Sequence, residues 1–333
     1  MKIDGSIGEG GGQVLRTSLA LAAVRGERVV VENARAGREE KGLKAQHLAG
    51  VRALAALTDA TVEGDEMGSG RIVFEPNTLC GGEYEVDVGT AGAVTLVAHA
   101  VLPAALYADD DVVIRIRGGT HVRWSPTYEY FADIFLPLLR DAGAKADAEL
   151  VRRGHYPQGG GEVVLRVSPS SLSLVEPRRG ELKRVTGVSH ACGLPEGIVE
   201  RQAESARERL AELGAPVDID EVHVDEAPSK GTAVTLIGHA GTRLGGSALG
   251  ERGKPAEEIG VEAADELIEG VESGADLDAY VADQLVPYVA LAGGSYEVPR
   301  VTSHLRTNVR VASKFGDVSL DGTRVVGTQE QDS

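Results

Sequence analysis

Residues 4–13 read Asp4-Gly5-Ser6-Ile7-Gly8-Glu9-Gly10-Gly11-Gly12-Gln13 and lead into an amphipathic pattern that predicts a helix over residues 13–25. The free N–H groups and the dipole of a helix N-terminus attract anions, so this glycine turn could hold a phosphate group. It lacks the Gly-Lys-Ser/Thr ending of a P-loop and the glycine spacing of a dinucleotide fingerprint. The stretch is therefore either a tight turn alone or a turn that lets phosphate approach the backbone.

A second polar segment near the C-terminus reads Ser303-His304-Leu305-Arg306-Thr307-Asn308. It places His304 at the start of a predicted helix, where the imidazole could attack phosphorus and split a difficult transfer into two easier steps. Glu9 in the glycine turn offers oxygen ligands suited to Mg²⁺ or Mn²⁺. Arg16 lies about one turn into the first helix and could reach the same anion. Together these residues indicate nucleotidyl transfer.

Composition limits the classes of protein that fit this chain. Of 333 residues, 42% are hydrophobic and only 4% aromatic, which predicts two domains or a repeat array around an aliphatic core. We expect a soluble, cytoplasmic protein without membrane contact, because no long apolar run or signal peptide is present. Cys80 and Cys192 match no metal-ligand spacing and are expected to be buried and unpaired.

The formal net charge of −17 marks the chain as strongly acidic. This charge favours either ordinary solubility or adaptation to high internal salt, as in a halophile. Binding of nucleic acid would need a local basic cluster. The densest basic run in the first half of the chain comprises Arg35, Arg38, Lys41 and Lys44, with Gln46 and His47 after it. Guanidinium groups suit bidentate phosphate contacts, so this run is either a clamp for a phosphate terminus or a solvated loop.

The order of predicted elements returns along the chain, with matching strands around Val30 and Val113. The predicted helices of the three copies lie at 13–25, 43–57, 91–106, 128–142, 277–292 and 303–314. Each copy also contains predicted strands, and those of the third copy lie near 295–299, 317–320 and 323–327. Residues 180–275 differ, with strongly charged helices at 196–213 and 255–271 that are expected to expose their charged faces. They are predicted to form an inserted small domain.

These segments together resemble the RNA 3′-terminal phosphate cyclase family. The matching motifs run through the whole chain in order: Gly8–Arg16, Arg35–Arg38, Gln46-His47-Leu48, Tyr156-Pro157 before Gly159–Gly161, Ala282-Asp283-Gln284-Leu285 and Ser303-His304-Leu305. The resemblance implies an α+β fold of three repeated units, each with two helices on a four-stranded sheet, plus a small inserted α/β domain. The large domain would comprise residues 1–179 and 276–333, and the inserted domain residues 180–275.

The resemblance also implies the reaction. ATP and RNA ending in a 3′-phosphate would give a 2′,3′-cyclic phosphate end, AMP and pyrophosphate. His304 would attack the α-phosphate of ATP and carry AMP, which would pass to the RNA 3′-phosphate. The neighbouring 2′-hydroxyl would then attack the activated phosphorus and expel AMP.

Individual site residues follow from the same resemblance. Glu9 would be the metal-associated carboxylate, holding Mg²⁺ or Mn²⁺. Arg16, Arg35 and Arg38 would join His304 as catalytic residues, and Arg35, Arg38 and Gln46 would bind the RNA end. The adenosine pocket would comprise Pro126, Tyr280, Val281, Ala282, Asp283, Gln284 and, in place of the Gln common in bacterial relatives, His99. One imidazole does not reproduce both faces of an amide, so His99 departs from the family pattern.

Two other interpretations remain beside the cyclase. A ribosome-assembly protein from a divergent branch of the same superfamily would lack the nucleophilic histidine. An enolpyruvyl transferase on a related repeat fold would not need it. The presence of His304 favours the cyclase over both.

Overall fold

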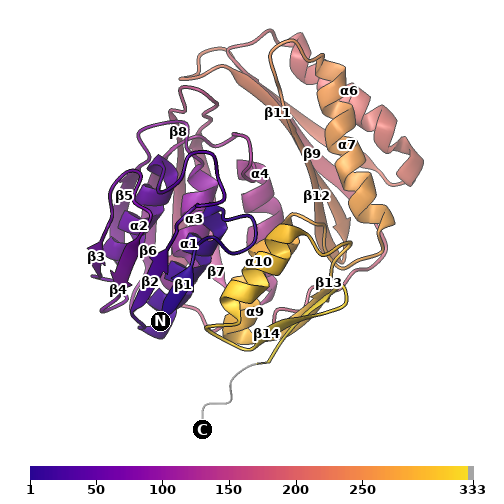
Figure 1. The fold of residues 1–333 in the computed structure, drawn as a ribbon. Helices are drawn as coiled ribbons and strands as arrows, with labels where there is room; N and C mark the ends of the chain where they lie inside the picture. The colour runs from indigo at the N-terminus through magenta and orange to yellow at the C-terminus, as the bar shows by residue number, and fades with distance from the viewer. Residues whose placement is uncertain (329–333) are drawn as a thin grey trace.

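A computed structural model describes residues 1–328, which form an α+β fold (Figure 1). The first unit comprises β1 (Lys2–Asp4), α1 (Gly12–Arg25), β2 (Val29–Glu32), α2 (Ala45–Leu57), β3 (Thr61–Glu63) and β4 (Ile72–Glu75). Its strands lie in the order β1-β2-β4-β3, with β1 parallel to β2 and β4 antiparallel to both its neighbours. Val29 and Val31 are buried because alternate side chains of a strand face the helices.

The second unit repeats this plan. It comprises β5 (Gly82–Asp87), α3 (Val94–Ala105), β6 (Val112–Gly118), α4 (Tyr128–Tyr130), a π-helical turn (Phe131–Phe135), α5 (Leu136–Asp141), β7 (Lys145–Arg152) and β8 (Gly161–Ser168). The strand order β5-β6-β8-β7 and the strand directions match those of the first unit. The structural repeat predicted from the strands around Val30 and Val113 is thus confirmed.

The third unit is smaller than the resemblance implies. It comprises α8 (Val281–Gln284), α9 (Val286–Ala292), β13 (Gly294–Glu297), α10 (Ser303–Ala312), β14 (Val318–Asp321) and β15 (Arg324–Gly327). Its sheet has three strands, in the order β13-β15-β14. Val175 makes a single parallel bridge to Gly294, at the place that the first strand occupies in the other units. The chain then continues into residues 180–275, so a fourth strand does not develop.

Residues 180–275 form a further sheet with its own helices. The elements are β9 (Arg184–Cys192), α6 (Gly197–Leu210), a 3₁₀ turn (Ala211–Leu213), β10 (Val217–Val224), β11 (Gly231–Ala240), β12 (Thr242–Leu249) and α7 (Ala256–Glu272). The strand order is β10-β9-β11-β12, and α6 packs against α7. Figure 1 shows this sheet beside the repeated units. It encloses a separate apolar cluster that includes Ala203, Leu236 and Leu267.

Two helices that the sequence predicts as single elements are interrupted. The predicted helix 128–142 contains the π-helical turn, and the predicted helix 277–292 divides into α8 and α9. Pro137 and Pro287 stand at the start of α5 and α9, and proline has no N–H for the carbonyl four residues back. The Asp278 carboxylate accepts the N–H groups of Tyr280 and Val281 at 2.8 and 3.0 Å, which fixes the start of α8.

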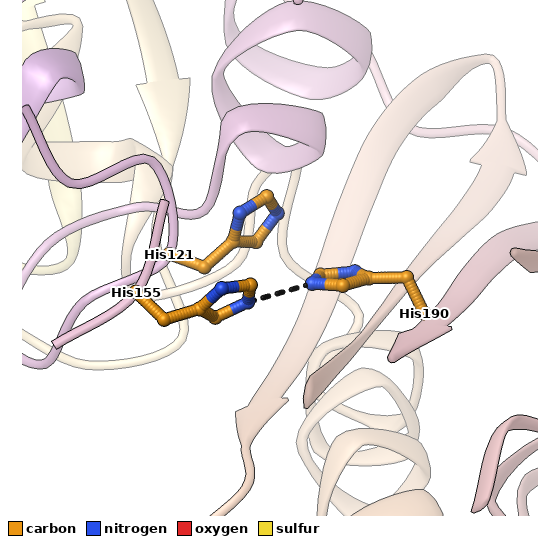
Figure 2. Close-up of side chains that lie close together, drawn as sticks. All are labelled: His121, His155 and His190. Carbon is orange, nitrogen blue, oxygen red and sulfur yellow. Dashed lines mark hydrogen bonds between the residues drawn. The ribbon is translucent and has the colours of Figure 1, made fainter. Parts of the chain in front are cut away.

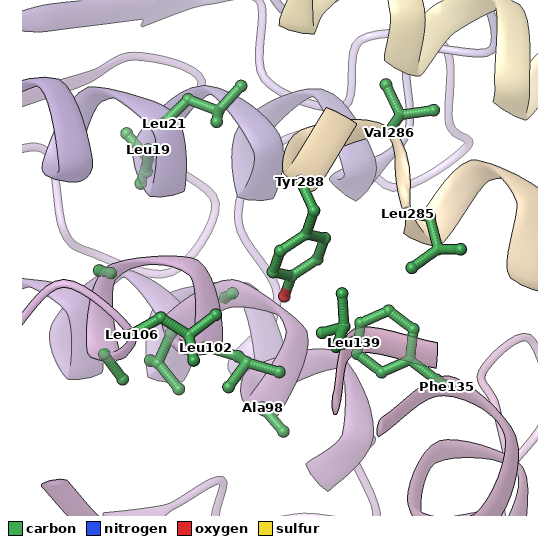
Figure 3. Packing of buried hydrophobic residues seen from close by; sticks show 14 of the residues in the cluster. Leu19, Leu21, Ala98, Leu102, Leu106, Phe135, Leu139, Leu285, Val286 and Tyr288 are labelled. Atoms are coloured by element: carbon green, nitrogen blue, oxygen red, sulfur yellow. The ribbon is translucent and has the colours of Figure 1, made fainter. Parts of the chain in front are cut away.

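The largest apolar cluster lies between the helices of the three units (Figure 3). Leu19 of α1 and Leu102 of α3 are fully buried in it. Tyr288 of α9 meets Phe135, with ring centroids 5.8 Å apart. Each buried leucine stabilises such a core by about 1.5–3 kcal/mol. The same packing sets α1 against α10, so the N-terminal glycine turn meets the C-terminal histidine.

Candidate functional site

The centre of the candidate site is a contact between a carboxylate near the N-terminus and an imidazole near the C-terminus. Glu9 lies in the loop between β1 and α1, and His304 lies in the first turn of α10. Imidazole Nε2 of His304 is 3.1 Å from Oε2 of Glu9. The side chains are 50% and 39% exposed, so a substrate can reach them. The Thr302 hydroxyl accepts the Leu305 N–H at 3.0 Å and caps the helix.

A close backbone approach makes this pairing possible. Gly8 has φ +62°, in the left-handed region that favours glycine. A Cβ at Gly8 would lie 1.9 Å from Oγ1 of Thr307, one turn into α10. The turn can therefore rest against α10 only without a side chain at this position.

Neighbouring groups keep the Glu9 carboxyl ionised. The Ser303 hydroxyl donates a hydrogen bond to Oε1, and this contact is the main reason that the pKa of Glu9 lies below its usual value. Burial opposes this shift with an effect second in size to that of Ser303, and the charges of His304 and Arg38 lower the pKa further. Nη2 of Arg38 lies 3.3 Å from Oε2. Glu9 thus presents a carboxylate between a histidine and an arginine.

Arg16 lies deeper, next to the Tyr280–Gln284 segment. Burial lowers its pKa to about 10, and the nearby Asp283 opposes this shift, so Arg16 is a cation at neutral pH. Burial raises the pKa of Asp283 to about 7, although Arg16 and a hydrogen bond donated by the Gln13 amide both lower it. The Asp283 carbonyl accepts the Asn308 side-chain amide at 2.6 Å. These contacts join α1, α8 and α10.

Two histidines share the surroundings of Arg16. Burial, with a contribution from Arg16, lowers the pKa of His99 to about 3 and that of His47 to about 3. The Gln284 side chain lies close enough to His99 to oppose its shift. The His99 ring also lies edge-on to Phe135, with centroids 4.3 Å apart. His99 is therefore a neutral ring between Arg16 and aromatic side chains.

The predicted RNA-end residues divide into two settings. Arg38 is 44% exposed beside Glu9. Arg35 is buried, and its guanidinium donates to the Gly42 carbonyl at 2.7 Å within the same loop. Gln46 lines a small pocket together with Arg16, and its side-chain oxygen accepts the Ala93 N–H at 3.2 Å. Arg38 is thus the exposed guanidinium of this run.

The remaining predicted adenosine-pocket residues differ in their contacts and in their exposure. The Pro126 carbonyl accepts the Thr95 hydroxyl at 2.9 Å, one turn before His99 on α3. Tyr280 is 56% exposed, and its hydroxyl interacts with Glu266 of α7. Val281 and Ala282 are buried, so they offer the pocket backbone and shape and little accessible side chain.

Sequence reasoning assigned no role to several residues that the structure brings into the site. Gln13 binds Asp283, Ser303 binds Glu9, and the Thr17 hydroxyl donates to the Asn308 side-chain oxygen at 2.5 Å. Gln13 and Ser303 lie next to the predicted residues in the two motifs. Their partners lie more than 200 residues away, so no local pattern indicates them.

A second histidine group lies away from this centre. His121, His155 and His190 are buried and come together from three segments (Figure 2). His121 follows β6 and His155 lies between β7 and β8, whereas His190 lies on β9. No sequence spacing links either of the first two to His190.

The fold defines an α+β protein of repeated units in which the first and last units share one polar site. A family model described as RNA 3′-terminal phosphate cyclase matches residues 7–321. The RNA 3′-terminal phosphate cyclase of Pyrococcus furiosus is 46% identical over 316 residues, covering 94% of this chain and 92% of that protein. Those of Pyrobaculum aerophilum and Methanopyrus kandleri are 45% and 44% identical, each over at least 92% of both chains.

The chain belongs to the RNA 3′-terminal phosphate cyclase family. It is an ATP-dependent enzyme whose reaction converts an RNA 3′-phosphate end to a 2′,3′-cyclic phosphate. The sequence-based prediction of family and reaction is thus confirmed. Among the described residues, no helix is both long and apolar enough to cross a membrane.

Proposed function

We propose that His304 is the nucleophile of the cyclase reaction. The observation that carries the proposal is the contact between His304 Nε2 and Glu9 Oε2 at 3.1 Å, on an exposed helix start beside a glycine turn. Imidazole attack on the α-phosphate of ATP forms a P–N bond and releases pyrophosphate. A phosphate oxygen of the RNA end then displaces the imidazole and takes the AMP group. The 2′-hydroxyl attacks the same RNA phosphorus, loses its proton and expels AMP.

The surroundings of His304 support separate roles for its neighbours. Glu9 holds the imidazole through Nε2 in the present arrangement, and its ionised carboxylate suits a hard divalent cation such as Mg²⁺ or Mn²⁺. Such a cation, when bound, would neutralise phosphate charge. The N-terminus of α1 follows the glycine turn and directs N–H groups to the same region. Arg16 adds a half-buried positive charge on the same helix.

We assign the two ends of the substrate to the two sides of this centre. Arg38 and Gln46 would meet the RNA 3′-phosphate, and Arg35 would hold their loop through the Gly42 carbonyl. His99, Pro126 and Tyr280–Gln284 would form the adenosine side. The uncharged ring of His99 is suited to contact a base, and the charge of Arg16 acts on both His99 and Asp283 on this side of the centre.

The test is transfer of label from ATP radiolabelled at the α-phosphate. Wild type, His304→Ala and the control His239→Ala are incubated with Mn²⁺ or Mg²⁺ and resolved on a denaturing gel. We expect acid-labile label on wild type and on the control, and none on His304→Ala. RNA with a 3′-phosphate should release the label, and RNA with a 3′-hydroxyl should not. Equal labelling of His304→Ala would refute the assignment.

We further propose that residues 180–275 form an inserted domain and that residues 1–179 and 276–333 form the catalytic one. The separate apolar cluster of the β9–β12 sheet supports this division. Expression of residues 180–275 alone tests it: a cooperative unfolding transition is expected, and an unfolded product would contradict it.

We also propose a cytoplasmic location, because the two cysteines are free, as suits a reducing compartment.

A further inference from the structure

Three imidazole rings from distant segments meet in the interior of the protein (Figure 2). His121 follows β6, His155 lies between β7 and β8, and His190 lies on β9. Their relative exposures are 2%, 4% and 1%. One ligand atom from each ring can be chosen so that all three lie within 4.8 Å of one another. The first two rings belong to the second repeated unit, and the third belongs to residues 180–275.

Not every ring nitrogen of these histidines has a complete set of hydrogen-bond partners. Nε2 of His155 faces Nε2 of His190 at 3.0 Å, where a single proton can lie between two nitrogen lone pairs. Nδ1 of His155 is buried and has no hydrogen-bond partner among the described residues. Burial lowers the pKa of His155 to about 3 and that of His190 well below its usual value. With His155 and His190 facing each other through Nε2, and Nε2 of His121 held by Glu129, His121 would bind through Nδ1, which now lies 2.7 Å from the Thr120 hydroxyl.

A carboxylate completes the arrangement around the third ring. Oε2 of Glu129 lies 2.6 Å from Nε2 of His121, and Nη2 of Arg153 donates to the other oxygen of Glu129 at 2.5 Å. Burial raises the pKa of Glu129, but His121 and Arg153 outweigh it and lower the pKa to about 2. A carboxylate beside a ligating histidine is the usual outer contact in metal sites, where it orients the ring.

We propose that His121, His155 and His190 bind one divalent transition-metal ion, of which Zn²⁺ is the best match. Imidazole nitrogens suit zinc and its neighbours, and three histidines with one further ligand make a tetrahedral site. Ligand nitrogens around zinc stand about 3.3 Å apart, given bonds of about 2.0–2.1 Å. The His155–His190 pair already has nearly this separation. The ligand nitrogen of His121 lies within 4.8 Å of the other two. A shift of roughly 1.5 Å or less would bring it to the spacing that zinc requires.

The position of the site gives the ion a structural role. His155 is also tied to the inserted segment by its backbone, since its N–H donates to Oγ of Ser229 at 2.7 Å. Its ring packs on Gly231, where an added Cβ would lie 2.3 Å from the imidazole. A metal held by all three histidines would therefore fasten residues 180–275 to the second repeated unit. This role is separate from the reaction at His304.

Metal binding to the full-length chain tests the proposal. The Glu9→Gln, His304→Ala double variant serves as the background, so that the reaction centre contributes no ligands. After removal of metal with a chelator, Co²⁺ is titrated in and its visible spectrum recorded, and Zn²⁺ is then added as competitor. We expect one Co²⁺ per chain with the intense absorption of a tetrahedral site, displacement by Zn²⁺, and a higher thermal midpoint with Zn²⁺.

Variants of the cluster provide the specificity arm. His155→Ala and His190→Ala should each weaken Zn²⁺ binding at least 10-fold and remove the thermal shift. His239→Ala, in the neighbouring strand β11, should retain both. Retention of tight binding by His190→Ala would overturn the proposal. If the two cluster variants do not fold, Co²⁺ binding to the Glu9→Gln, His304→Ala background still tests the proposal. No binding, or the weak spectrum of an octahedral site, would overturn the proposal.

Discussion

His304 and His190 are the same residue type in opposite settings. His304 is half-exposed at a helix start, with the Glu9 carboxylate as its partner. His190 is 1% exposed on a central strand, and its partner is the ring of His155. The first imidazole can be reached by a phosphate group, and the second cannot be reached without opening the fold. Reactivity of a histidine here is set by access and by the charge of its partner.

The largest expected effect separates the two histidines by activity. His304→Ala should reduce labelling of the protein from ATP by at least about 10³-fold, as for loss of a nucleophile in other enzymes. Its free energy of unfolding in urea should change by less than about 0.5 kcal/mol, because the side chain is exposed. A large loss of stability would remove the contrast with His190.

The reverse substitution tests the buried partner. His190→Ala, measured without added metal, should lower the free energy of unfolding by about 2–4 kcal/mol. It leaves a cavity and removes the hydrogen-bond partner of His155. Its rate of labelling from ATP at a temperature where it is folded should stay within about 3-fold of wild type. Urea unfolding and the labelling assay measure the two effects, and a labelling defect like that of His304→Ala would show that the two regions are coupled.

The partner of the exposed histidine is tested by Glu9→Gln. The amide keeps the size of the side chain but removes the charge that pairs with His304 and Arg38. We expect labelling to fall by about 10–100-fold, a smaller loss than that for His304→Ala. Glu27→Gln, on an exposed residue after α1, is the matched control and should leave the rate unchanged. Wild-type activity in Glu9→Gln would show that the contact is dispensable.

A smaller effect concerns the pH dependence of stability near the site. The pKa of Asp283 is about 7 in the folded protein, against 3.8 for an ordinary aspartate. Between these values the folded state holds a proton that the unfolded state has lost, so stability should fall as pH rises. The slope is at most about 1.4 kcal/mol per pH unit. Asp283→Asn should remove this contribution, which urea unfolding between pH 4.5 and 8 would reveal; an unchanged slope would contradict it.

The fold was largely predictable because its elements are local. The apolar periodicity gave helix 13–25 and the strands around Val30 and Val113, and the repeat of their order followed. The helix predicted over 128–142 was wrong as a single element: Pro137 lies inside that range and marks the start of α5, but a proline does not by itself indicate the π-helical turn before it. The third sheet fell short of four strands because the chain leaves its edge after Val175.

The candidate site was predictable as motifs and less so as contacts. Glu9 and His304 lie in segments whose composition already indicates phosphate chemistry. The inward course of Arg35 toward Gly42 depends on the loop's own backbone, in which Arg35 adopts φ +57°. Burial of Asp283, which moves its pKa to about 7, follows from packing of α8 against α1 and α10.

By itself, the sequence determined the family, the repeated α+β units and the two motifs that hold Glu9 and His304, because these features are written in short stretches of chain. Only the tertiary structure decided that the N-terminal turn lies against α10, and that His121, His155 and His190 share one buried place. Such meetings depend on the packing of helices and sheets between units. No spacing along the chain encodes a distance across a core.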